Sequence, residues 1–385
     1  MNLNVAMIGP RGCGKTSVLS IMLGEIENFI NKLNTDKEVK KHCNPKIQAP
    51  GMAIEILKLA YADLRNVAAR NVLQDGVNIL LPGAQHSVHN IDLTVSGITT
   101  TLSFHDFPGA YFLPEYHQRM VDADLQKMNK AFNTADVIVL CVDVPSQITY
   151  PPKDKNLVAR DTSYVNYITS LIKTSLQKRS PNNLKKTVLV LPIKSEGEIL
   201  NTVPDPIIGG YRQYIDPGKN DNLYQKVKNL YKDLFDYLKD ESSVDSFYVP
   251  VITMGCVKAA GVEYDHELGM SRIRFEPVVK GPLNYYQCNS SALLALCLWS
   301  AEAVITQQYV DNITLFGRLK HLFSGKYPTE YFRDELFEEC SLQRLRLEYL
   351  LRQQEPDSLS AEEKSNYETI KKAVEQLPFN GCRWI

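Results

Sequence analysis

The stretch GPRGCGKT, residues Gly9 to Thr16, is the strongest indication of the fold of this chain. It matches the pattern G-x-x-x-x-G-K-[ST], in which glycines let successive backbone N–H groups converge on phosphate oxygens at the N-terminus of a helix. The apolar run LNVAMI precedes it, and apolar residues at helical spacing follow it. We therefore predict the order strand, loop, helix, with the loop holding the phosphates of a nucleotide.

Two side chains at the end of this phosphate-binding loop, or P-loop, have specific predicted roles. Lys15 is expected to bridge the β- and γ-phosphates, and Thr16 is expected to ligate Mg²⁺. The alternative is a glycine turn with an unrelated lysine, and the position of the pattern between a strand and a helix argues against it. The residues predicted here to bind nucleotide are Gly9, Arg11, Gly12, Cys13, Gly14, Lys15, Thr16 and Ser17.

A second motif, DFPG, begins at Asp106. Apolar and polar residues alternate over 91–95 and again over 98–104, with a Ser-Gly turn between them, which predicts a β-hairpin. Asp106 then stands at the tip of the second strand, where an aspartate can hold Mg²⁺ through water, and the amide of Gly109 can sense a γ-phosphate. Lys15, Asp106 and Gly109 are the predicted catalytic residues, and Thr16 and Asp106 the predicted metal ligands.

The middle of the chain alternates between strand and helix patterns. Buried strands are predicted at 136–144, 187–193 and 246–254, with helices at 161–178 and 223–239 between them. Such alternation implies a mostly parallel sheet covered on both faces. The predicted fold class is a doubly wound α/β P-loop sheet with one antiparallel hairpin strand.

The chain divides into two predicted regions. Residues 1–315 are expected to form the P-loop domain, with a helical insert at about 34–88. Residues 316–385 are expected to form a C-terminal helical extension, with one helix at 329–353 and a second opened by the capping box SAEE at 360–363. The apolar stretch 291–305 is predicted to be one buried helix, because it is too short and too polar to span a bilayer.

Charge, cysteine content and the N-terminal pattern limit the possible partners and the expected location of the protein. The chain has 385 residues, with 43 Lys+Arg against 44 Asp+Glu, so the net charge of −1 indicates no nucleic-acid partner. The eight cysteines form no C-x-x-C pair and stand mostly within apolar stretches, as reduced core residues do. The N-terminus lacks the pattern of a signal peptide. A cytoplasmic protein without a transmembrane segment is expected.

Together, the P-loop, the hairpin and the D-x-x-G motif resemble the translation-factor-related (TRAFAC) class of GTPases. Within that class, the proline of D-x-P-G, the long insert before the hairpin and the region 120–143 are similar to the bacterial double-GTPase families and their relatives with a D-Y-P-G-E motif. The resemblance covers roughly residues 1 to 310. It implies GTP as the nucleotide and, by analogy alone, a role in bacterial defence. Mg²⁺ is expected from the two motifs, and a protein partner or self-association is expected through the C-terminal helices, which lie beyond the resemblance.

The resemblance also implies where the base binds. The class carries [N/T]-K-x-D after the next strand, and this chain reads IKSE at 193–196. Lys194 is expected to lie along the guanine plane, and Glu196 to accept from guanine N1 and N2; a solvated loop at the strand end is the alternative. Gly255 and Cys256 follow the last strand, where the class places a small-residue loop that contacts the base. This second match favours GTP, with ATP as the alternative.

Two departures from the class bear on catalysis. Ala110 stands where the class has a water-positioning glutamine and the relatives have a glutamate, and an alanine side chain can orient no water. The threonine that the class places before the hairpin to close over Mg²⁺ has no clear counterpart here, because residues 81–87 offer only the hydroxyl of Ser87. We therefore predict a slow or partner-activated GTPase, with a catalytically inactive pseudo-GTPase acting as a binding or signalling module, or an ATP-specific P-loop NTPase, as alternatives. Substitute water-positioning groups are sought among Gln85, His86, His105, Glu115 and His117.

Overall fold

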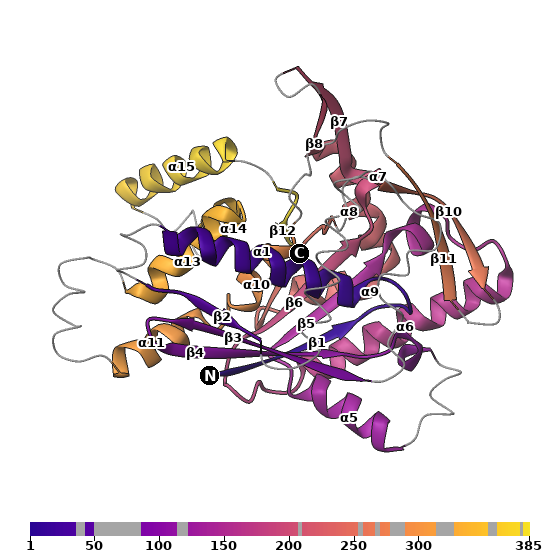
Figure 1. The fold of residues 1–385 in the computed structure, drawn as a ribbon, viewed down its shortest axis with the longest axis horizontal. Helices are drawn as coiled ribbons and strands as arrows, with labels where there is room; N and C mark the ends of the chain where they lie inside the picture. Colours follow the sequence, from indigo (N-terminus) through magenta and orange to yellow (C-terminus); the bar gives the residue numbers. More distant parts are fainter. Residues whose placement is uncertain are drawn as a thin grey trace.

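The computed structural model describes residues 1–35, 43–49, 86–113, 122–206, 210–252, 257–265, 270–277, 289–312, 327–352, 360–377 and 380–385. Within these ranges an eight-stranded sheet forms the centre of the molecule (Figure 1), in the order β12-β9-β6-β5-β1-β4-β3-β2. The strands are β1 Asn2–Ile8, β2 Lys46–Gln48, β3 Ser87–Val95, β4 Ile98–Asp106, β5 Val137–Asp143, β6 Lys186–Ile193, β9 Val244–Tyr248 and β12 Arg383–Trp384.

Five neighbouring strands of this sheet, β9, β6, β5, β1 and β4, run parallel. The other three are antiparallel to their neighbours: β3 pairs with β4, β2 with β3, and β12 with β9. The predicted parallel sheet with an antiparallel hairpin strand is therefore confirmed. The two outer strands β2 and β12 are additions, each too short to leave a sequence signal of its own.

Helices cover both faces of the sheet (Figure 1). Along β1, Val5 and Met7 enter one apolar cluster, while Ala6 and Ile8 enter the other, as the alternation of a strand requires. The doubly wound architecture is therefore confirmed in the described residues. The first cluster lies with α1 Lys15–Thr35 and α10 Ser290–Cys297, and the second with α5 Asp122–Asn133, α6 Lys155–Leu176, α8 Pro217–Leu230 and α9 Lys232–Asp240.

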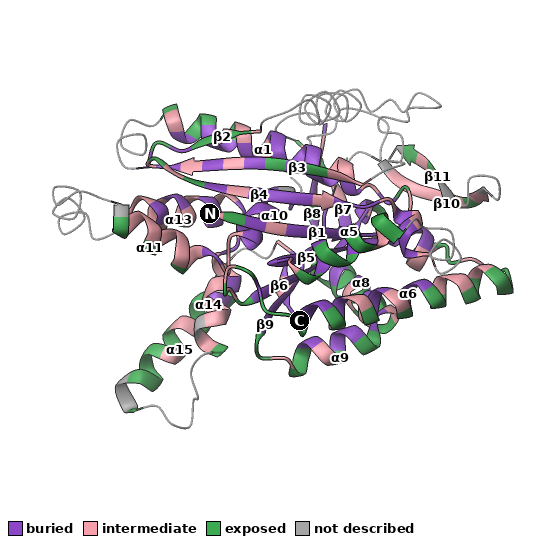
Figure 2. Ribbon diagram, turned by 90° about the horizontal axis from the view of Figure 1, so that it is seen from below, coloured by how far each residue is buried: buried purple, intermediate pink, exposed green. Residues whose placement is uncertain are grey.

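The central strands have no solvated face. Every residue of β5 and of β6 is buried, which is why both read as continuous apolar runs in the sequence. Figure 2 shows these strands buried at the centre, whereas much of the outer surface of α6 and α9 is exposed. The carboxyl ends of the parallel strands therefore lie on a rigid platform, and the P-loop leaves from one of them.

Three predicted single helices are each broken in two. The stretch 223–239 covers parts of α8 and α9, which are separated at Tyr231, where φ is −108° and the backbone leaves the helical conformation. The stretch 329–353 forms α13 Pro328–Glu339 and α14 Gln343–Arg352, because Ser341 adopts a left-handed backbone with φ of 52°. The stretch 291–305 forms α10 and then α11 Glu302–Asn312, at an angle of 66°. Between these two, the amides of Trp299 and Ala301 bond to carbonyls only three residues back, which tightens the turn and redirects the chain.

The other predictions on local structure have mixed outcomes. The capping box is confirmed: Ser360 and Glu363 bond reciprocally at the start of α15 Ala361–Gln376. Within the insert predicted at about 34–88, residues 46–48 form the edge strand β2, in which Ile47 packs against the core between two polar residues. The rest of that insert lies largely outside the described residues.

Two hairpins outside the main sheet were not predicted. They are β7 Leu200–Asp205 with β8 Gly210–Ile215, and β10 Val257–Asp265 with β11 Met270–Pro277. A four-residue helix, α7 Glu196–Ile199, joins β6 to the first hairpin. Among the described residues, no single helix is both long and apolar enough to cross a membrane, and α10 and α11 meet those criteria only when counted as one bent pair.

The C-terminal residues are built into the main core. The ring of Trp384 lies 4.3 Å from Phe247, 5.4 Å from Tyr349 and 5.6 Å from Trp299, centroid to centroid, and its indole N–H donates to the carbonyl of Leu345 at 3.2 Å. These contacts join β12, β9 and α14. A division of the chain at residue 315 stays a prediction.

Replacing Trp384 with alanine should lower the free energy of unfolding by about 3–5 kcal/mol, because it removes a buried aromatic side chain from a packed cluster. Denaturant titration followed by far-UV circular dichroism measures the change. Val158→Ala is the control: this side chain is 45% exposed, so its loss should change the free energy by no more than about 0.5 kcal/mol. Equal effects of the two substitutions would contradict the packing role of the C-terminus.

Candidate functional site

The P-loop has the predicted position between β1 and α1. Its tight path needs glycine at three points. Gly12 and Gly14 have positive φ of 74° and 105°, and a Cβ on Gly9 would stand 2.7 Å from the sulfur of Cys13 and 2.9 Å from the Cβ of Cys141. The first helical bond beyond the loop, from the amide of Val18 to the carbonyl of Gly14, is 3.0 Å long.

Lys15 and Thr16 meet Asp106 at the mouth of this loop. The Thr16 hydroxyl donates to Oδ2 of Asp106 at 2.7 Å, and Nζ of Lys15 lies 3.8 Å from Oδ1 of the same carboxylate and 3.3 Å from the carbonyl of Gly9. Burial lowers the pKa of the Lys15 ammonium, and the Cys13 thiol and Asp106 raise it by more, so the net pKa stands above the ordinary lysine value. The two sequence motifs are therefore one site.

Gly109 packs directly onto the P-loop. A Cβ at this position would stand 2.1 Å from the backbone N of Arg11 and 2.3 Å from the carbonyl carbon of Pro10. Real Cβ atoms do not approach backbone this closely, so only glycine fits without moving the loop. The D-x-P-G motif then turns into a short 3-10 helix, Gly109–Phe112, which contains Ala110.

Lys194 ties the end of β6 to the P-loop. Its ammonium donates to the carbonyl of Gly12 at 2.8 Å and lies 3.3 Å from Oδ1 of Asp143, at the end of β5. The other oxygen of Asp143 accepts from the Ser146 hydroxyl at 2.6 Å. Lys194 itself has a left-handed backbone with φ of 58°, which turns the chain sharply after the strand.

The other residues predicted to recognise the base are Glu196, Gly255 and Cys256. Glu196 is the first residue of α7 and is buried, 4% exposed. Gly255 and Cys256 lie outside the described residues. Their roles in binding a base stay predictions.

Two of the predicted water-positioning candidates stack on each other instead. The rings of His86 and His105 are 5.4 Å apart, the ring of His86 lies 4.2 Å from Phe107, and Nε2 of His86 lies 3.3 Å from Nδ1 of His105. His105 precedes Asp106 in β4, so its side chain points to the opposite face of the sheet from the carboxylate that meets Thr16. Gln85, Glu115 and His117 lie outside the described residues.

A polar pocket that sequence reasoning missed lies beside the P-loop, with an empty volume of about 490 Å³. It brings the loop and the D-x-P-G glycine together with a π-helical turn, Pro145–Thr149, and with α6. No motif marks these side chains, because the α6 positions are ordinary polar residues within a helical pattern. The lining residues are Pro10, Arg11, Gly109, Leu113, Asp143, Ser146, Gln147, Arg160, Asp161 and Tyr164.

The donor set at the mouth of the loop fits Mg²⁺. The Thr16 hydroxyl and the Asp106 carboxylate are hard oxygen ligands held within one hydrogen bond of each other. Mg²⁺ is held in nucleotide sites by one or two such groups together with phosphate oxygens and water. Within the described ranges, no group of three or more His, Cys, Asp or Glu side chains is placed to hold a metal ion.

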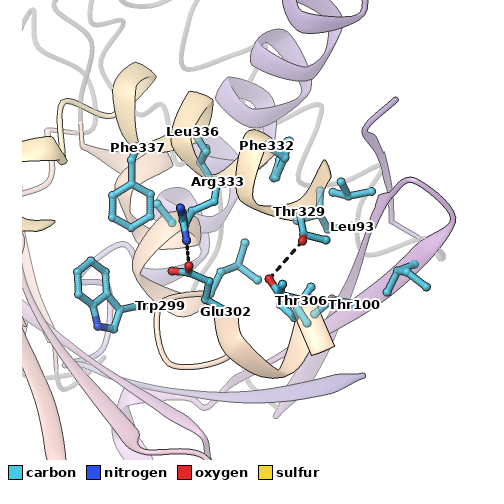
Figure 3. A pocket seen from close by; sticks show the side chains of 15 residues that line it. Leu93, Thr100, Trp299, Glu302, Thr306, Thr329, Phe332, Arg333, Leu336 and Phe337 are labelled. Atoms are coloured by element: carbon cyan, nitrogen blue, oxygen red, sulfur yellow. Dashed lines mark hydrogen bonds and ion pairs between the residues drawn. The ribbon is translucent and has the colours of Figure 1, made fainter. Parts of the chain in front are cut away.

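A second, apolar pocket lies at the other end of the β3–β4 hairpin and contains no P-loop residue. Figure 3 shows Phe332, Leu336 and Phe337 of α13 facing Leu93 across it, with an ion pair between Glu302 and Arg333 on its wall. Its empty volume is about 550 Å³.

Comparison with known proteins gives matches among solved structures. No protein-family profile matches the chain, and no curated protein matches it. Among solved structures, it is similar to the GTPase-like domain of S. cerevisiae Ski7, bound to GDP and inorganic phosphate, at 13% identity and a TM-score of 0.30, covering 82% of this chain and 51% of that one. It is also similar to LeoA, a bacterial dynamin GTPase from ETEC, at 14% identity and a TM-score of 0.25, covering 93% and 64%. The chain thus spans about half of the first protein and under two thirds of the second.

The half-buried stack of His86 and His105 should make stability depend on pH. Burial and the neighbouring His86 lower the pKa of His105 to about 4, against about 6.5 in an unfolded chain. Between these values the unfolded state binds more protons, so the stability present above pH 6.5 should fall as the pH falls towards 4. His105→Asn should make this slope shallower in thermal unfolding curves recorded from pH 7.5 to 4. An unchanged slope would show that His105 titrates normally.

Proposed function

We propose that this protein is a nucleotide-operated switch that binds GTP with Mg²⁺ and hydrolyses its γ-phosphate slowly or on activation by a partner. The observation that supports this best is the convergence of Lys15 and Thr16 on Asp106, with the hydroxyl 2.7 Å from the carboxylate. Phosphate-binding and metal-binding groups from two distant motifs meet at the carboxyl edge of parallel strands, where open α/β sheets bind ligands.

The chain's own residues would act on the phosphates as follows. Backbone N–H groups of the P-loop and the Lys15 ammonium would bind the β- and γ-phosphate oxygens and stabilise the charge that develops on them. Mg²⁺, when bound through Thr16 and Asp106, would neutralise phosphate charge. Water would attack the γ-phosphorus, the bond to the β–γ bridging oxygen would break, and GDP and inorganic phosphate would leave. Ala110 offers no polar group to orient that water, so intrinsic turnover should be slow.

The D-x-P-G turn is proposed as the moving part. Gly109 lies against Pro10 and Arg11, so a γ-phosphate in the loop would be sensed directly by this turn. A change in the position of Gly109 would be transmitted through Phe107 and Phe112, whose rings lie 5.6 and 6.1 Å from that of Phe132 in α5, centroid to centroid. Loss of the γ-phosphate would release this contact.

Guanine is the proposed base. Lys194 lies across the P-loop at Gly12, with its ammonium held by Asp143, and its alkyl stem is available to a planar base. Glu196 follows two residues later at the start of α7 and is proposed to accept from guanine N1 and N2. Gly255 and Cys256 are proposed to complete the base site through their backbone.

Finer assignments remain part of the proposal. The strand order and the antiparallel β3 support membership of the translation-factor-related GTPase class. Cys13, Cys141, Cys297, Cys340 and Cys382 are buried thiols without a disulfide, which supports a reducing, cytoplasmic location. A protein partner or a second copy is proposed to bind at the C-terminal helices. A role in bacterial defence rests on the family resemblance alone.

Ala110 also supports a second candidate, a pseudo-GTPase that binds nucleotide for signalling without turning it over. The two candidates share the binding site and differ only in phosphate release. Release of phosphate by nucleotide-saturated protein, alone or with a partner, would exclude the second.

The test of the proposal is binding of fluorescent GTP and ATP analogues in the presence of Mg²⁺. Wild type should prefer the GTP analogue, and Lys15→Ala should weaken its binding by about a hundredfold, because a charge-assisted contact to two phosphates is worth roughly 3 kcal/mol. Lys153→Ala, a lysine in the exposed loop before α6, should leave binding unchanged. Absence of binding by wild type to either nucleotide would refute the proposal.

A second experiment tests the base. Glu196→Gln should move the preference from GTP towards XTP, because the glutamine amide can donate to the carbonyl at xanthine C2 where the carboxylate would accept from the guanine amino group. Competition of unlabelled GTP, XTP and ATP against the fluorescent analogue measures this. If wild type and Glu196→Gln rank GTP, XTP and ATP in the same order, Glu196 does not contact the base.

A further inference from the structure

The pocket beside the P-loop contains two buried donors that have no acceptor. Among the described residues, Nε of Arg160 and the hydroxyl of Tyr164 are buried and make no hydrogen bond. Both residues stand on α6 four positions apart, so they lie on the same face of the helix. Tyr164 is 3% exposed. A buried donor without an acceptor is unfavourable, so two of them in one pocket indicate an acceptor that binds there.

The pocket opens where a γ-phosphate would lie. Its other walls are Pro10 and Arg11 of the P-loop and Gly109 of the D-x-P-G motif. Two carboxylates on its wall are already paired with cations: Oδ1 of Asp143, which accepts no hydrogen bond, lies 3.3 Å from the Lys194 ammonium, and Asp161 pairs with Arg160. Arg160 and Tyr164 therefore line the same pocket as Pro10, Arg11 and Gly109.

Arg160 is held in place from its other side. Its guanidinium lies 4.6 Å from the ring centroid of Tyr264 in β10 and donates to the hydroxyl of that residue, and it pairs with the Asp161 carboxylate at 3.6 Å. These contacts occupy the terminal nitrogens and leave Nε for a ligand. A planar guanidinium fixed in this way loses little freedom when it binds an oxyanion.

We propose that Arg160 and Tyr164 contact the γ-phosphate of the bound nucleotide, so that the chain supplies its own arginine to the site. This inference rests on the proposed function. It gives a group that stabilises charge on the γ-phosphate, which Ala110 cannot do, and it leaves the orientation of the attacking water to a partner. Phosphate oxygens are the acceptors that Arg Nε and a tyrosine hydroxyl both suit.

The experiment compares binding of GDP with binding of a non-hydrolysable GTP analogue that has an imido β–γ bridge, both with Mg²⁺. In Arg160→Ala, the affinity for the GTP analogue should fall by about tenfold or more, whereas the affinity for GDP should change by less than about twofold. Arg160→Lys should restore part of the loss by returning the charge. Arg179→Ala, an exposed arginine near the far end of the same helix, is the matched control.

Tyr164→Phe separates a ligand contact from a structural role. Without nucleotide, the variant should be at least as thermostable as wild type, because it loses a buried hydroxyl that has no partner. With the GTP analogue, its affinity should fall by several-fold relative to GDP. A variant that is less stable without nucleotide and binds both ligands as wild type does would show a structural hydroxyl.

The outcomes distinguish this inference from the proposal on which it rests. Failure of wild type to bind either nucleotide removes both. Normal binding of both nucleotides by wild type, with an unchanged ratio of affinities in Arg160→Ala and Tyr164→Phe, overturns the inference alone and assigns the pocket to solvent.

Discussion

The hydrogen bond between Thr16 and Asp106 is the contact on which the rest of the site depends. It joins the first turn of α1 to the end of β4, two elements 90 residues apart in the chain. The bond requires β1 and β4 to be parallel neighbours in a fixed register, with Met7 opposite Asp106, so that both strands end at the same edge. A shift of β4 by one residue would put His105 at this place and turn Asp106 to the other face. The site therefore forms only when β4 pairs with β1 in this register.

Close backbone contact extends this constraint to the surrounding loops. Gly9 lies over Cys13 and Cys141, and Gly109 lies on the backbone of Pro10 and Arg11, at separations that leave no room for a Cβ. Lys194 closes the third side through the carbonyl of Gly12. The P-loop is thus held by three elements that come from separate parts of the sequence, which limits how far it can relax when phosphates enter or leave.

The π-helical turn after β5 and the β10–β11 hairpin add side chains and contacts around the site. The π-helical turn after β5 carries Ser146 and Gln147 to the pocket wall, where Ser146 fixes Asp143. The β10–β11 hairpin reaches across to α6 through Tyr264 and Arg160, and to the turn through a hydrogen bond from the Tyr150 hydroxyl to Ala259. Because this hairpin follows the strand end at which a base is proposed to bind, it connects the base side of the site with the γ-phosphate side.

The P-loop, the β3–β4 hairpin and the parallel core could all be predicted from the sequence, because glycine spacing, two-residue alternation and unbroken apolar runs are local consequences of backbone geometry. The sequence also placed Lys15, Thr16 and Asp106, since each stands beside a strand end that the pattern marks. It failed at 329–353 and 291–305, where single helices were predicted, because a left-handed Ser341 and a tight turn before α11 leave no periodic signal. Only the tertiary structure brought Arg160 and Tyr164 to the P-loop and laid Lys194 over Gly12. Those contacts depend on how α6 packs against the sheet and on where β6 lies within it. The residue spacing within one segment does not predict how that segment packs against a distant one.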